Sequence, residues 1–285
     1  MSTQVTTAFV QQFSSNIQLL SQQMGSLLRG SVDSETVVGE KAFFDQVGKA
    51  AAQQRTSRHA DTPLMDTPHS RRMVTLADYE WADLIDDQDK VRMLADPTST
   101  YARAAAAAMG RQMDDTIIAA ANGTAYTGAS GSTSTALPSG QKIAHGSGGL
   151  TVAKLVSAKK ILDANTIDPS IPRYIAVSPE QIEDLLNITT VTSADYNTVK
   201  ALVQGDIDTF CGFKFITTTR LTDDGTSRLC LAWAEDGLKL GLGKDVTAQI
   251  SERPDKSYST QVYYCMSIGA TRMEEEKVVQ IACNE

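Results

Sequence analysis

Near the start of the chain the hydrophobic positions repeat with the period of a helix. The apolar side chains, at spacings of four and three, are Phe9, Phe13, Ile17, Leu20, Met24 and Leu27, with polar residues between them. This pattern predicts an amphipathic helix over residues 7–29, ended by Arg29 and Gly30. A single apolar stripe must be buried against something. The partner is either the same domain or a neighbouring copy, and Phe13, Ile17 and Leu20 are the candidate contacts.

Residues 97–121 predict one long, alanine-rich helix. Asp96 is placed to accept from the free amides of the first turn, and Pro97 has the torsion of a first helical position. At the other end, Asn122 and Gly123 suit a left-handed exit. At 1.5 Å per residue the helix would be about 37 Å long. Because alanine combines high helix propensity with little volume, it suits a thin layer against a sheet and indicates a scaffold rather than a catalyst.

Residues 51–80 are polar and interrupted by proline, with short β-like pieces such as residues 72–77, and they predict a long extended hairpin. Charge is segregated here. The basic residues are Arg55, Arg58, Arg71 and Arg72, and the acidic residues that follow include Asp78, Glu80, Asp83, Asp86 and Asp87. Either these are an ordinary solvated surface, or the basic hairpin of one copy lies over the acidic segment or long helix of the next. Complementary charge would then fix register more than affinity.

The remaining pattern mixes helices with strands. Residues 128–149 are rich in Gly and Ser and predict a flexible loop or a seam between lobes. Helices are expected at 150–164, from 179 onwards and briefly within 196–208, with a loop at 187–195 between the last two. Strands are expected at 173–178, 212–217, 228–233, 245–251, 259–268 and 277–282. Strands that follow mixed helices, without repeated strand–helix–strand units, indicate an α+β fold.

Composition and charge argue against two classes of function, nucleic-acid binding and membrane spanning. The chain has 285 residues and a net charge of -8, which argues against nucleic-acid binding as a main activity because phosphate contacts need clustered Lys and Arg. No apolar run reaches the roughly 20 residues of a membrane span. The first residues lack the regions of a signal peptide, so cytosolic synthesis is expected.

No residue pattern indicates catalysis, a cofactor or a metal. The four cysteines (Cys211, Cys230, Cys265 and Cys283) form no Cys-x-x-Cys pair and are expected to pack as small buried hydrophobes. Residues 241–245 resemble a phosphate loop but lack its spacing. Ser178 precedes a proline and an acid, which is a helix cap rather than a nucleophile elbow. The histidines (His59, His69 and His145) belong to no convergent set.

Taken in order, these elements resemble the major capsid protein of tailed bacteriophages, which has the Hong-Kong-97-type fold. The resemblance implies an N-terminal arm over residues 1–50, an extended loop over 51–80, and a peripheral domain that begins at 81–149 and contains the spine helix 97–121. It further implies an axial domain over 150–242 and return strands of the peripheral domain over 243–285. The residues that carry it include 86–89, 174–180, 212–216 and 268–272.

The resemblance implies a structural protein that forms pentamers and hexamers in an icosahedral shell around double-stranded DNA. Some members of the family crosslink through a lysine on the extended loop, but residues 51–77 contain none, so that crosslink is not expected here. Only about fifty residues precede the loop, so a separate scaffolding protein is expected, together with a portal. A decoration protein is left open. The expected location is the virion, after assembly in the bacterial cytoplasm.

Three other readings stay open from the sequence. An encapsulin-type compartment shares the fold but holds cargo enzymes. A soluble α+β enzyme with an unrecognised site would have a deep pocket and a small oligomeric state. A phage tail or decoration protein would seldom need a long spine helix.

Overall fold

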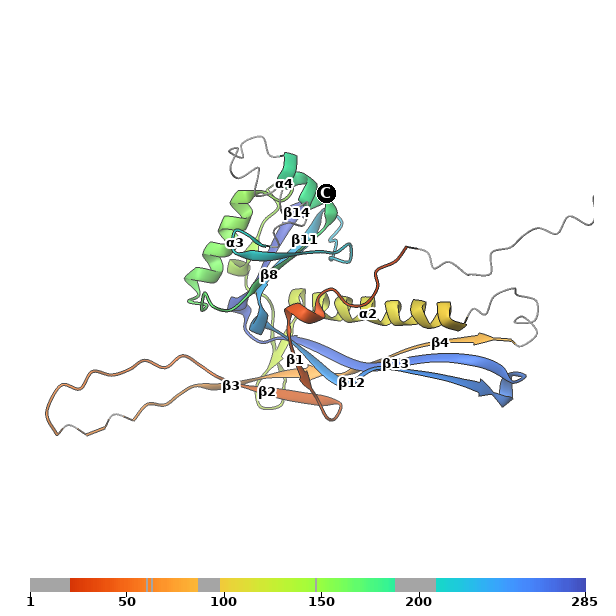
Figure 1. Cartoon of the computed structure of the whole chain (residues 1–285). Helices are drawn as coiled ribbons and strands as arrows, with labels where there is room; N and C mark the ends of the chain where they lie inside the picture. Colours follow the sequence, from red (N-terminus) through yellow and green to blue (C-terminus); the bar gives the residue numbers. More distant parts are fainter. Residues whose placement is uncertain (1–20, 60, 63, 87–97, 147, 188–208) are drawn as a thin grey trace, which may run out of the picture. The chain divides into compact units, whose positions relative to one another are not determined.

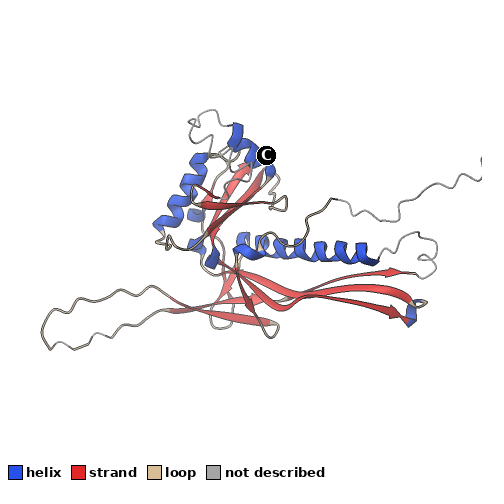
Figure 2. Cartoon of the chain, viewed as in Figure 1, coloured by secondary structure: helices blue, strands red, loops and turns tan. Residues whose placement is uncertain are grey.

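The computed structural model describes residues 21–59, 61–62, 64–86, 98–146, 148–187 and 209–285. The chain divides into two compact units. The smaller unit contains Met1–Ser26, Asp78–Arg111 and Lys244–Met266, and the larger contains Leu27–Ala77, Gln112–Gly243 and Ser267–Glu285. Figure 1 labels the elements along the chain and Figure 2 separates helices from strands. Helices and sheets are mixed, as the sequence predicts.

The long helix is confirmed as α2 (Thr98–Asn122), which belongs to the smaller unit up to Arg111 and to the larger unit beyond it. Its buried side recurs every fourth residue, at Ala105, Met109, Met113, Ile117 and Ala121. Asp114 is also buried, and its carboxylate accepts from the backbone amides of Leu27 and Leu28 at 3.1 Å each. The helix therefore holds the segment around Leu28 by a charged acceptor as well as by packing.

The exit from α2 differs from the prediction. Gly123 does not take a left-handed conformation, and its amide continues the helix by donating to the carbonyl of Ala119 at 2.8 Å. A Cβ at this position would lie 2.6 Å from that oxygen, so glycine is needed for close approach rather than for its torsion. The predicted caps at residues 96 and 97 lie outside the described residues.

A six-stranded sheet forms one core of the larger unit, in the order β7–β14–β11–β8–β10–β9. Its strands are β7 (Lys142–Ile143), β8 (Arg173–Val177), β9 (Thr209–Phe210), β10 (Phe213–Thr217), β11 (Ser227–Ala234) and β14 (Val278–Asn284). Helix α3 (Val152–Ala164) packs beside β14 through buried Leu155, Ala158 and Leu162. Helix α4 (Pro179–Asn187) follows β8 directly, as the sequence predicts (Figure 1).

The last strand, β14, pairs with strands that are distant in the sequence. It lies between β7 and β11 in the six-stranded sheet. It pairs antiparallel with residues 227–233 of β11, for example Cys230 opposite Ile281. A buried apolar strand carries no mark of which distant strand it pairs with, so the pattern alone could not place it.

A second sheet of the larger unit, in the order β2–β3–β5–β6, contains the predicted hairpin. Strands β2 (Lys41–Val47) and β3 (His69–Thr75) pair antiparallel, so the hairpin starts before residue 51. Strands β5 (Ala125–Thr127) and β6 (Thr133–Thr135) complete the sheet, and β6 lies within residues 128–149, which the sequence predicts as a flexible loop. Phe44, Val74 and Val37 form its buried core.

The longest strands are β12 (Leu238–Arg253) and β13 (Ser259–Arg272), which form a sheet in the order β1–β12–β13–β4 with β1 (Asp33–Thr36) and β4 (Ala77–Ile85). Both predicted strands are confirmed but are longer than the pattern indicated. Strand β4 contains most of the acidic segment. Its exposure alternates, with Tyr79, Trp81 and Asp83 half-buried on one face.

The N-terminal helix is not confirmed where the structure describes it. Residues 21–28 are not helical, and only a short 3-10 turn, η2 (Arg29–Ser31), follows. Phe13, Ile17 and Leu20 lie outside the described residues, as do the loop and helix predicted within 188–208. The apolar stripe therefore predicts a helix that extends too far at its C-terminal end. Just beyond that end, the indole N–H of Trp233 donates to the carbonyl of Ser31 at 2.8 Å.

Candidate functional site

The two strands of the hairpin are hydrogen-bonded to each other at its base, and most residues beyond the base are exposed. Among the described residues, the outermost backbone bond across it joins the amide of Gly48 to the carbonyl of Pro68 at 2.8 Å. Past this point, the described residues of the two limbs form no strand. Arg55 and Arg58 are exposed there, and Leu64 is 98% exposed. Single exposed apolar residues are common on protein surfaces, so Leu64 alone does not mark a contact.

Arg71 faces its neighbouring strand. Its guanidinium lies 2.9 Å from the carboxylate of Asp45, the residue opposite it in the β2–β3 register, and 5.5 Å from the ring centre of Phe43. Both charged side chains are well exposed, so the pair contributes at most about 1 kcal/mol. Arg71 therefore keeps the character of a surface residue that the sequence predicts.

Arg72 corrects the expectation. Its side chain is buried within its own unit, 2.5 Å from the carboxylate of Glu275, and its Nε donates to the carbonyl of Met273 at 2.8 Å. Glu275 also lies 3.7 Å from the Nε of fully buried Arg272. Arg72 is thus part of the interior and not a surface contact. Successive side chains of a strand point to opposite faces, so Arg71 faces outward and Arg72 inward. The separation of basic and acidic residues in the sequence does not show this.

Arg272 ends helix α2. It donates from Nη1 to the carbonyls of Ala121 and Gly123, at 2.9 and 2.8 Å, and from Nη2 to that of Thr135 at 3.0 Å. Burial lowers the pKa of this guanidinium, partly offset by Glu275. Neither Arg272 nor Glu275 carries a local sequence signal for these contacts, because their partners lie about 150 and 200 positions earlier.

The acidic residues lie on and beside β4. Asp78 and Glu80 are exposed, and Glu80 accepts from the hydroxyl of Tyr263 on β13 at 2.8 Å, a bond that raises the pKa of that phenol. Asp83 is half-buried, and its carboxylate accepts from the amide of Leu84 at 2.8 Å. Asp86 accepts from the hydroxyl of Ser259. Asp87 lies outside the described residues.

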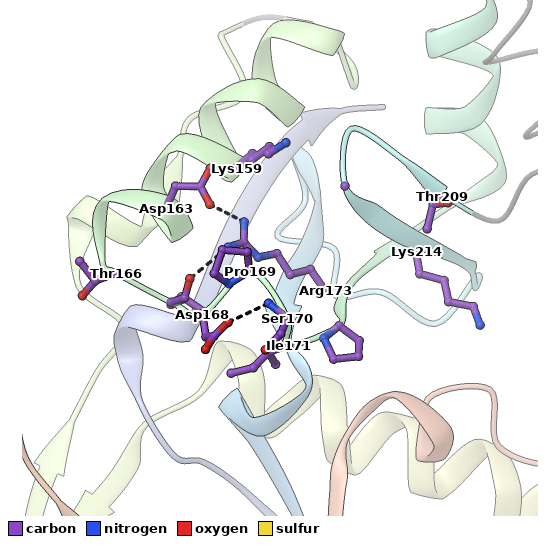
Figure 3. Close-up of a pocket in the computed structure, with 13 residues that line it drawn as sticks. Lys159, Asp163, Thr166, Asp168, Pro169, Ser170, Ile171, Arg173, Thr209 and Lys214 are labelled. Atoms are coloured by element: carbon purple, nitrogen blue, oxygen red, sulfur yellow. Dashed lines mark hydrogen bonds and ion pairs between the residues drawn. The ribbon is translucent and has the colours of Figure 1, made fainter.

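A cavity of about 880 Å³ opens beside the end of α3 (Figure 3). Two of its charged side chains form an ion pair, and a third caps a backbone turn. Arg173 lies 2.6 Å from Asp163, and Asp168 accepts from the amide of Ser170 at 2.8 Å, which lowers the pKa of that carboxyl group. A smaller cavity of about 490 Å³ lies at the hairpin base and includes His69 and Arg71. Neither set of lining residues pairs a nucleophile with a base.

The described residues contain neither a cluster of metal ligands nor a membrane-spanning helix. No group of three or more His, Cys, Asp or Glu side chains there could hold a metal ion. In that same part of the chain, no helix is long and apolar enough to cross a membrane. Two of the cysteines, Cys230 and Cys283, are buried as expected, whereas Cys211 and Cys265 are only half-buried.

The same fold occurs in solved phage capsids. The capsid structure of the cyanophage P-SCSP1u has a TM-score of 0.77 at 18% identity and covers 100% of this chain and 96% of its own. The capsid of Ralstonia phage GP4 has a TM-score of 0.76 at 10% identity, over 97% and 95%. A Mycobacterium phage Che8 structure has a TM-score of 0.70 at 17% identity, over 96% and 97%. At these identities the likeness shows the fold alone.

Residues 5–285 match the phage capsid protein family, and the chain belongs to that family. It is therefore a structural subunit of a phage capsid. The encapsulin reading is not favoured, because both the family and the similar structures are those of phage particles. No curated protein matches the chain.

Proposed function

We propose that this chain is the major capsid protein of a tailed bacteriophage and assembles into the icosahedral head shell around its double-stranded DNA. The observation that carries the proposal is the β2–β3 hairpin, which is fixed at its base by Arg72 and Glu275 and continues beyond Gly48 and Pro68 as two largely exposed limbs. Obligate assemblies bury more than roughly 2,000 Å² per interface. A thin subunit supplies such an area through extended segments.

Contacts between unlike patches close into rings, and this chain would form pentamers and hexamers in that way. The exposed Arg55 and Arg58 of one copy would lie over Asp78 and Glu80 of the next, with Arg71 at the edge of the contact. Asp83, Asp86 and Asp87 would extend the acidic surface. In the N-terminal arm, Phe13, Ile17 and Leu20 would pack on a neighbour.

The proposed domains follow the family pattern. Residues 1–50 would be the arm and 51–80 the extended loop. The base of that loop would be formed by β2 and β3. Residues 81–149 and 243–277 would form the peripheral domain, and 150–242 together with β14 the axial domain. The expected partners are copies of the chain, a separate scaffolding protein and a portal, with assembly in the host cytoplasm. We propose no catalytic activity, no cofactor and no sequence-specific nucleic-acid binding.

Electron microscopy of the purified chain, alone and with the scaffolding protein encoded beside it, tests the proposal. Closed shells or capsomers are the expected result, and a persistent compact monomer under both conditions would overturn it. The charge contact is tested by the double variant Arg55→Glu and Arg58→Glu, with the double variant Arg55→Lys and Arg58→Lys as the matched control. The glutamate variant should stay folded but assemble poorly, and normal shells from it would reject the contact.

A further inference from the structure

The outer half of β12 is an open strand edge. Within the smaller unit the strand order is β12–β13–β4, so β13 covers only one side of β12. Its other side pairs with β1 over residues 239–242. Beyond Leu242, no strand among the described residues pairs with that side. All residues from 243 to 252 are exposed, on both faces of the strand. An edge of this kind can pair with another chain. On this edge the amide of Val246 donates to the carboxylate of Asp245 at 2.8 Å, so pairing would exchange that bond for one to the partner strand.

The two edges of this sheet differ in chemistry. The β4 edge carries Asp78, Glu80 and Asp83, and charges of one sign are a usual device against edge-to-edge pairing. On β12, the six residues from Val246 to Ser251 carry no charge, no proline and no glycine. Val246 is 36% and Ile250 is 56% exposed. An edge of this kind is an aggregation hazard unless a partner strand covers it.

We propose that the outer edge of β12 pairs antiparallel with the same edge of a second copy, in a register centred on Ala248. In this register Val246 lies opposite Ile250, Thr247 lies opposite Gln249, and Ala248 meets its own counterpart. Asp245 lies opposite Ser251 and Glu252 opposite Lys244, so no like charges oppose one another. The stretch is therefore complementary to itself in both its apolar and its polar positions.

Other pairings of the two edges are less favourable. A register centred between Ala248 and Gln249 puts Asp245 opposite Glu252 in both halves. A register centred on Gln249 puts Glu252 opposite the apolar Val246. In-register parallel pairing would set each acidic residue beside its own copy. Like charges directly opposite destabilise a strand pair, so charge and apolar matching select the antiparallel register centred on Ala248.

This contact rests on the proposed function, because only an assembly brings many copies together. It also adds to it. An isologous contact uses the same patch on both subunits and joins them about a twofold axis. The hairpin contact joins unlike patches and closes rings. A shell needs both kinds of contact, one within a ring of subunits and one between rings.

Crosslinking tests the register. In assembled particles, Ala248→Cys should give a disulfide-linked dimer under mild oxidation, because directly opposed residues lie about 4.5–5.5 Å apart between Cα atoms, within the reach of a disulfide. The unmodified chain is the control for the native cysteines. Peptide mapping should join position 248 to position 248. A link from position 248 to any other segment, or a dimer from Gln249→Cys but not from Ala248→Cys, would overturn the proposal.

A charge on the edge tests its role. Ala248→Lys should leave the subunit folded and reduce the yield of closed particles at least tenfold. Ala82→Lys, the same change at an exposed position of the β4 edge, should assemble normally. Normal particles from both variants would overturn the edge contact and leave the proposed function intact. Failure of the unmodified chain to form any particle would instead count against the proposed function itself.

Discussion

The guanidinium of Arg72 on β3 lies 2.5 Å from the carboxylate of Glu275, a residue that follows it by 203 positions. Side-chain exposures of 10% and 15% make this a buried ion pair. Arg272 approaches the same carboxylate from the end of β13 and binds the last carbonyls of α2. One buried acid thus connects the hairpin base with the end of the long helix, inside the larger unit.

Replacing Glu275 with Gln should strongly destabilise the subunit. The change leaves two buried guanidinium groups, those of Arg72 and Arg272, without their counter-charge, and breaking a buried pair costs about 3–5 kcal/mol. Chemical denaturation of the unassembled subunit measures the free energy of unfolding. The adjacent Glu276→Gln is the matched control, because its pair with Lys49 is exposed and should contribute less than about 1 kcal/mol. Equal losses in the two variants would contradict the role given to the buried pair.

The two adjacent hairpin arginines should respond differently to charge reversal. Arg71→Glu places a carboxylate opposite exposed Asp45 and should cost about 1 kcal/mol or less, leaving a folded subunit. Arg72→Glu places it against buried Glu275 and should prevent stable folding. Near-ultraviolet circular dichroism and size-exclusion chromatography distinguish the outcomes. A well-folded Arg72→Glu subunit would show that the hairpin base does not depend on this ion pair.

The elements that could be predicted from sequence are those with a strong local pattern. Helix α2 ends one residue beyond its predicted bound, its predicted start lies outside the described residues, and β8 and β11 are found where their apolar runs are. What could not be predicted depends on distant pairing. Neither the insertion of β14 between β7 and β11 nor the meeting of Arg72 with Glu275 has a local signal, because both follow from how remote segments pack. The inward direction of the Arg72 side chain can be predicted only when the register of β3 in its sheet is known.

Replacing Gly110 with Ala should destabilise the smaller unit, although alanine is the better helix former. In an open helix interior this change would gain up to about 1 kcal/mol. Here the added Cβ would lie within 3.0 Å of three backbone atoms of Gly25, and backbone cannot move aside as a flexible side chain can. A fall in melting temperature is therefore expected. Gly140→Ala is the control, since nothing lies within 4 Å of its added carbon. Stabilisation by Gly110→Ala would show that residues around Gly25 do not hold this position.

Glu285 should make the stability of the larger unit depend on pH. Its carboxylate accepts from Arg228 at 2.7 Å, from Gln181 at 2.7 Å and from Ser178 at 2.8 Å. These bonds, that to Arg228 foremost, lower its pKa from 4.5 to about 2. The folded-state pKa is depressed, so this stabilisation is fully present above pH 4.5 and is lost as the pH falls toward 2. Because Glu285 is exposed and solvent screens its ion pair, this stabilisation should amount to about 1 kcal/mol.

Glu285→Gln should therefore lower the melting temperature at neutral pH, and the difference from the unmodified chain should narrow as the pH falls below about 4.5. Thermal melts of the unassembled subunit at a series of pH values measure this. In an Arg228→Leu background the same substitution should have a smaller effect and a weaker pH dependence, because the principal donor to the carboxylate has been removed. A melting difference that stays constant across this range would mean that the bonds to Glu285 contribute to stability by packing rather than by charge.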